Sequence, residues 1–399
     1  MKFNARNLSE NIATLAVLCI FSGYFFYHYL LAAFGIPRFL SGYYSPLVSL
    51  FSLTILIVQA FRPSLIITKA DRWVYLLLTM MSMLSIIYIL FGDGLQSSHE
   101  YAVGIAETIW VFFGTYLIIR NANLSSIPLI KSVMTLMIIQ CIFIIYYGIT
   151  DGKFLLKTIS ENKELNVAGY QQIGALLLFQ LGIAMSTIKK NMKSVIYLIG
   201  LIALFYNGAR SEFVAFLVSG MVLIVISFEK KYAAFLYGIV VIIVGIYIGQ
   251  FMNLAESEAR TQTVSDIFNE SSYLERSGQI NFAIECISES PFLGCYGDDL
   301  LHGEGSYSHN ILSAWQTYGA AVFLMLLMLF IGKIRSTFAY MRDKYVSLGQ
   351  LNNISELAIY YLVIALFMMI FSKSFLDIVF AISLSIMAQL ENALYKTKK

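Results

Sequence analysis

The sequence has few charged residues and lacks the short motifs typical of soluble enzymes. Only 13% of its 399 residues are charged, against roughly 25% in soluble domains, whereas 58% are hydrophobic. It contains no P-loop, no GxSxG elbow, no DxD, and no HExxH, CxxC or HxxxH metal pattern. The composition excludes an ordinary soluble domain. The missing motifs predict no metal, no cofactor and no energy coupling through ATP, and nucleic acid is not an expected partner.

Long apolar runs occupy most of the chain, and each is compatible with a helix in a bilayer. The runs cover 12–34, 43–61, 73–91, 102–120, 128–149, 167–188, 194–207, 211–228, 232–251, 309–331, 357–371 and 374–392. The first run is longer than a signal-peptide core and no small-x-small site follows it, so we expect it to remain as the first transmembrane helix. The runs predict an all-α polytopic membrane protein with about 12 spans. Two closely spaced pairs, 194–207 with 211–228 and 357–371 with 374–392, could each be a hairpin or one broken helix, so eleven spans remain an alternative.

The basic residues predict the orientation of these spans. When twelve spans alternate from a cytoplasmic N-terminus, 19 of the 27 lysines and arginines fall on the cytoplasmic side. Lysine and arginine accumulate in cytoplasmic loops of membrane proteins. We therefore expect a multi-pass protein of the cytoplasmic membrane with both termini in the cytoplasm.

One late loop, residues 252–308, is long, acidic and predicted to face the extracytoplasmic side. It holds ten acidic residues but only Arg260 and Arg276 as basic ones, and no lysine. The chain therefore divides into spans 1–9 (residues 1–251), this extracytoplasmic loop (252–308), and spans 10–12 (309–399), all in one membrane domain.

The loop also predicts a short amphipathic helix and contains two cysteines. Ser272 and Glu275 form a capping box, and the four residues Ile280, Ala283, Ile284 and Ile287 form an apolar stripe. Pro291 should end this helix, with Gly294 and Gly297 supplying turns. Such a helix could lie along the membrane or cover a cavity between spans. Cys286 and Cys295 could form a disulfide, which the sequence leaves open.

Three residues on the predicted outer side could carry chemistry. Arg210 lies in a short turn between two spans, Arg276 opens the amphipathic helix, and His309 opens the tenth span between Ser308 and Asn310. Two guanidinium groups can bind a diphosphate, and an imidazole can accept a proton from a hydroxyl near neutral pH. Simpler roles compete with these: an arginine can solvate a helix end or pair with acids, and a histidine can cap a helix.

Other polar residues are weaker candidates for a site. Glu107 lies inside the fourth span, where a carboxylate is costly, so it is a candidate supporting residue. Lys373 and Asp377 are spaced to pair with each other. His28, near the outer end of the first span, is interpreted as a packing residue.

The late loop resembles that of bacterial O-antigen polymerases and O-antigen ligases. The resemblance lies in Arg276, "ESPFLGCYG" (289–297) and "SHNILSAWQTYG" (308–319), with a weaker match at "NGARSEFVAFLVSG" (207–220), where Ala209 and Ser211 depart from the family's Ser-Arg-Gly pattern. It covers roughly residues 207–330, and the first 200 residues agree only in being serial spans.

The resemblance implies a metal-independent, inverting glycosyltransferase that works at the periplasmic face. Its donor would be a glycan on undecaprenyl diphosphate, with Arg210 and Arg276 on the diphosphate and His309 as the general base. Ser308, Asn310 and Glu107 would support the site. Other expected partners are membrane lipids and a chain-length regulator.

Several functions remain open at this point. The net negative loop favours a polymerase, whose acceptor is a lipid-linked repeat unit, over a ligase, whose acceptor is a phosphorylated lipid A–core. A polytopic flippase for lipid-linked oligosaccharides is a further alternative, although the chain shows no internal halves. A non-catalytic scaffold of a glycan-export complex would give His309 no role. The sugars and their linkage leave no signature in the sequence.

Overall fold

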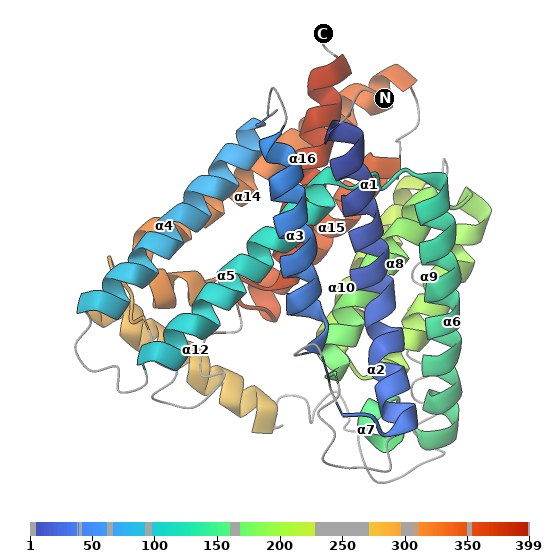
Figure 1. The fold of residues 1–399 in the computed structure, drawn as a ribbon, viewed down its shortest axis with the longest axis horizontal. Coiled ribbons are helices and arrows are strands. Elements are labelled where there is room, and N and C mark those ends of the chain that lie inside the picture. Colours follow the sequence, from blue (N-terminus) through green and yellow to red (C-terminus); the bar gives the residue numbers. More distant parts are fainter. Residues whose placement is uncertain are drawn as a thin grey trace. The chain divides into compact units, whose positions relative to one another are not determined.

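A computed structural model describes residues 5–37, 39, 42–61, 67–91, 98–159, 168–227, 271–296, 308, 310–348 and 353–397. These residues form helices and connecting turns, and no strand is found among them. The helices are α1(Ala5–Val17), the π-helical turn η1(Leu18–Ser22), α2(Gly23–Phe34), α3(Tyr44–Ala60), α4(Lys69–Phe91), α5(Ser98–Asn121), α6(Ile127–Asp151), α7(Leu156–Ile159), α8(Tyr170–Thr187), α9(Lys190–Asn207), α10(Arg210–Ser227), α12(Ser271–Glu289), α14(Leu312–Leu348), α15(Asn353–Phe371) and α16(Ile378–Thr397), drawn in Figure 1. The predicted all-α class is confirmed.

Six helical stretches in the described part of the chain are long and apolar enough to cross a membrane. They are Asn7–Phe34, Asp71–Leu90, Ile127–Asp151, Arg210–Ser227, Leu312–Ala339 and Asn353–Phe371. Tyr44–Ala60 and Ile378–Asn392 are shorter apolar helices. A multi-pass membrane protein is compatible with these helices, but the predicted count of about twelve spans is not confirmed. The ninth predicted span, 232–251, lies outside the described residues.

The chain divides into two compact units. Unit 1 contains residues 1–65, 114–256 and 341–364, and unit 2 contains residues 66–113, 257–340 and 365–399. Helices α5 and α15 each begin in one unit and end in the other.

Helix α8 is the centre of unit 1. Every residue from Ile173 to Ser186 is buried, and α8 packs against α6, α9, α10 and η1. Two glycines allow this close packing: a Cβ at Gly174 would lie 2.7 Å from the Cβ of Ala209, and one at Gly182 would lie 2.6 Å from the ring of Tyr360. A helix that is apolar on all sides is expected at such a central position.

The pair α9 and α10 forms a hairpin, which decides between the two alternatives for the runs at 194–207 and 211–228. Gly208 adopts the left-handed conformation (φ +72°) that ends α9. Lys193, near the start of α9, donates a hydrogen bond of 2.8 Å to the hydroxyl of Ser227 at the end of α10. The two helices are therefore antiparallel neighbours.

The first predicted span is one continuous helix with a π-turn in its middle. At this turn the amide of Gly23 bonds to the carbonyl of Leu18, which leaves the carbonyl of Cys19 without its α-helical donor. The hydroxyl of Tyr43 donates a hydrogen bond of 2.9 Å to this carbonyl instead.

Candidate functional site

The candidate site lies around the amino-terminal end of α14 in unit 2. A helix in the late loop is confirmed as α12, which ends at Glu289, shortly before Pro291. Its apolar stripe is only partly buried: Ala283 is fully buried, whereas Ile284 is 50% exposed. Cys286 is buried, because the chain after α12 folds back onto the face of the helix that carries this cysteine.

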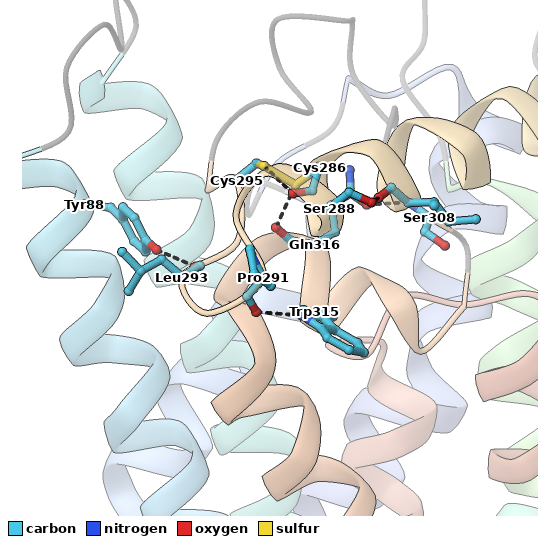
Figure 2. The surroundings of a disulfide bond; sticks show 10 residues. Tyr88, Cys286, Ser288, Pro291, Leu293, Cys295, Ser308, Trp315 and Gln316 are labelled. Carbon is cyan, nitrogen blue, oxygen red and sulfur yellow. Dashed lines mark hydrogen bonds between the residues drawn. A yellow bond between two sulfur atoms is a disulfide. The ribbon is translucent and has the colours of Figure 1, made fainter.

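A disulfide between Cys286 and Cys295 closes this fold-back and settles the pairing that the sequence left open (Figure 2). We call residues 286–295 the stapled turn. The amide of Ser290 bonds to the carbonyl of Cys286 at 2.9 Å, and the amide of Gly294 bonds to that of Ser290 at the same distance. Gly294 has a φ of +77°, in agreement with the predicted turn. Gly297, for which the sequence also predicts a turn, lies outside the described residues.

The stapled turn is docked on the first turns of α14. The amide of Cys295 donates to the carbonyl of Gln316 at 2.7 Å, and the amide of Ala320 donates to the carbonyl of Pro291 at 3.1 Å. The indole of Trp315 donates to the same Pro291 carbonyl at 2.8 Å, as Figure 2 shows. Bonds from several points of one helix fix the backbone of the turn.

A break in α14 at Gly319 makes room for this docking. Gly319 has φ +73° and ψ −176°, which are not helical values. A Cβ there would lie 2.1 Å from the carbonyl oxygen of Phe292 and 2.7 Å from the carbonyl carbon of Leu293. Only glycine combines this backbone conformation with such a close approach.

Helix α4 contributes an aromatic support to the same turn. The hydroxyl of Tyr88 donates a hydrogen bond to the carbonyl of Leu293, and its ring stacks on Tyr296 at a centroid distance of 4.9 Å. Tyr296 in turn contacts Tyr318 of α14, whose hydroxyl hydrogen-bonds with Ser85 at 2.9 Å. The aromatic contacts join α4, the stapled turn and α14.

Ser308 and Asn310 are held at the start of α14. The side-chain oxygen of Asn310 accepts a 2.8 Å hydrogen bond from the amide of Leu312 and a 2.6 Å bond from the hydroxyl of Ser308. The amide of Ser308 donates to Oε1 of Gln316 at 3.0 Å. Asn310 therefore acts as the cap of α14. His309 itself lies outside the described residues, although both of its neighbours in the chain are described.

Gln316 is the residue of this region that sequence reasoning missed. It is 2% exposed, its main-chain carbonyl binds the stapled turn, and its side-chain oxygen binds Ser308. Its Nε2 has no hydrogen-bond partner among the described residues. A buried amide with an unpaired donor is uncommon in folded proteins. A glutamine within an apolar run is the signal that could have found it.

The two arginines of the predicted site belong to different units. Arg210 is the first residue of α10, in unit 1, and its side chain is exposed. Arg276 lies in the second turn of α12, in unit 2, and its side chain is outside the described part. The proposed joint role of the arginines stays a prediction.

The remaining candidates have ordinary roles or exposed positions. The side chain of Glu107 is exposed on α5. Lys373 and Asp377 form the predicted ion pair, with an N···O distance of 3.6 Å. His28 is buried as predicted: its Nδ1 accepts from the amide of Ala168 at 3.2 Å, which leaves Nε2 to donate to the carbonyl of Gly42 at 3.3 Å. No cluster of three metal-ligating side chains occurs in the described ranges.

Comparison with protein-family models found no match to the chain, and comparison with curated proteins found none either.

Proposed function

We propose that the chain is a membrane-embedded glycosyltransferase, and specifically an O-antigen polymerase of the bacterial inner membrane. The donor is a glycan on undecaprenyl diphosphate, and the acceptor is a sugar hydroxyl of a second lipid-linked repeat unit. The main support is the start of α14, where Ser308 and Asn310, the two chain neighbours of His309, are each hydrogen-bonded to the helix.

The disulfide supports the placement of this end of α14 on the outer side of the membrane. Disulfides persist in oxidising compartments such as the periplasm and are rare in the cytosol. The opposite part of α14 carries Lys333, which is buried in an ion pair with Glu391 and is followed by Arg335. The stretch Leu312–Ala339, which begins at the stapled turn and includes Lys333, is long and apolar enough to cross a membrane. The disulfide beside the start of α14 and the basic residues Lys333 and Arg335 further along it give the same orientation as the positive-inside rule.

The reaction we propose is a single displacement at the anomeric carbon. His309 accepts the proton of the acceptor hydroxyl while its oxygen forms the new bond to the anomeric carbon. The bond from that carbon to the diphosphate oxygen breaks, and the diphosphate leaves with the electron pair. Arg210 and Arg276 stabilise the negative charge on this leaving group. Attack opposite the leaving group inverts the configuration.

The test is the glycan ladder of a polymerase-deficient strain that carries the wild-type chain or a variant. We expect the wild type to restore the ladder and His309→Ala to leave only core plus one unit. His302→Ala, a change of another histidine in the same loop, is the matched control and should retain the ladder.

Other outcomes would contradict the assignment. Glycan that is missing from the core and accumulates on the lipid carrier would identify a ligase. A wild-type ladder that persists in the well-expressed His309→Ala variant would refute the enzyme and favour a transporter or a scaffold.

A further inference from the structure

Two large apolar side chains of the stapled turn are exposed although their backbone is fixed. Phe292 is 80% exposed and Leu293 is 57% exposed. The Phe292 carbonyl lies close against Gly319, and the Leu293 carbonyl accepts a hydrogen bond from Tyr88. The disulfide and the bonds to α14 hold the same segment. The exposure is therefore a feature of the folded turn and does not come from a loose loop end.

The neighbouring surface of unit 2 is also apolar. On α4, Ile87 and Leu90 are 48% and 67% exposed, and they flank Tyr88, which contacts the turn. Large exposed apolar patches on a protein mark an interaction surface. Exposed apolar side chains therefore occur both on the turn and on the helix α4 that contacts it.

Exposed apolar residues continue along α14, which begins beneath the turn. Leu324, Met328 and Ile331 are each about half exposed, at 52%, 58% and 47%. Their spacing of four and three residues places them on one face of the helix. Because α14 is long and apolar enough to cross a membrane, acyl chains are the partner that covers this face.

The indole of Trp315, which contacts the stapled turn, indicates the depth of the turn in the membrane. Trp315 stacks on Phe323 at a centroid distance of 4.8 Å and donates its N–H to the carbonyl of Pro291. Tryptophan is enriched at the boundary between water and lipid, where its ring is apolar and its N–H is hydrogen-bonded. Glu289, the last residue of α12, is exposed and so limits how deeply the segment can enter the bilayer.

We propose that the stapled turn is a membrane-interface anchor that inserts Phe292 and Leu293 among the acyl chains of the outer leaflet. The same turn binds the first turns of α14, so the anchor sets the depth at which Ser308 and Asn310 meet the membrane surface. The anchor is independent of the transfer reaction, because its contacts are with lipid and not with glycan.

The test is photo-crosslinking of the full-length protein in nanodiscs of phosphatidylethanolamine and phosphatidylglycerol. Benzoylphenylalanine replaces Phe292 in one variant and Glu289 in a matched control, and mass spectrometry identifies the adducts. We expect lipid adducts at position 292 at least tenfold more abundant than at position 289.

Three results would overturn the anchor. These are the absence of lipid adducts at 292, equal yields at the two positions, and a crosslink from 292 to a second copy of the chain in place of lipid. The assay uses no glycan substrate. A failed anchor would therefore leave the glycan-ladder test intact, and a failed ladder test would leave the anchor intact.

Discussion

Removal of the Cys286–Cys295 disulfide should lower the free energy needed to open the stapled turn, by an amount that follows from the length of the loop. The two cysteines are nine residues apart, so the bond closes a loop of ten residues. The chain-entropy relation gives a stabilisation of about 2.7 kcal/mol for a loop of this length at room temperature. In the double variant Cys286→Ser/Cys295→Ser, local opening of the turn should become about 100-fold more frequent.

Amide hydrogen exchange measures this opening directly. Three amides report on it: Gly294 bonds to Ser290, Cys295 bonds to Gln316, and Ala320 bonds to Pro291. We expect exchange of these amides about 100-fold faster in the variant, and equally fast in the wild type after treatment with a reductant. Peptides of the buried segment 173–186 in unit 1 should keep their rates. A change of less than threefold would refute the reasoning, because the bonds to α14 would then hold the turn without the disulfide.

Three further changes test the packing. Gly319→Ala should destabilise unit 2 by more than about 3 kcal/mol in thermal unfolding, because φ is positive at this position and the new Cβ would clash with main-chain carbonyls. Gly332→Ala is the control: a Cβ there meets nothing within 4 Å, so this change should be neutral or stabilising. Lys193→Met should cost about 3 kcal/mol, because it leaves the partly buried carboxyl of Glu356 without its partner. Adding Glu356→Leu should recover most of that loss, whereas purely additive effects would argue against the pair. Gln316→Leu should speed exchange in peptide 308–313 by about tenfold or more, since a buried amide loses its acceptor; an unchanged rate would show that Asn310 alone holds this segment.

The position of the disulfide turn illustrates what local sequence signals can reach. Pro291 and Gly294 correctly predicted the end of α12 and a turn, because proline stops a helix and glycine adopts a positive φ without strain. The pairing of the two cysteines needed the distance between their side chains. That distance depends on how the turn folds back on α12, which a spacing of nine residues does not define.

Lys193 shows a limit of charge counting. The sequence placed it with the basic residues of a cytoplasmic loop, but helix α9 already begins at Lys190, and Lys193 is 3% exposed. Its ammonium group lies 2.5 Å from the carboxylate of Glu356, which is 163 residues away in the chain. A partner at such a separation has no local signature.

The sequence by itself determined that this protein is helical, that it is apolar enough for a membrane, and where most helices begin and end. These properties are local, because backbone bonds in a helix join residues four apart and the bilayer selects apolar runs. Only the tertiary structure decided the hairpin of α9 and α10, the disulfide, the break at Gly319, the role of Gln316 and the exposure of Phe292. Each of these depends on atoms from segments that are far apart in the chain, and close packing decides which of them meet.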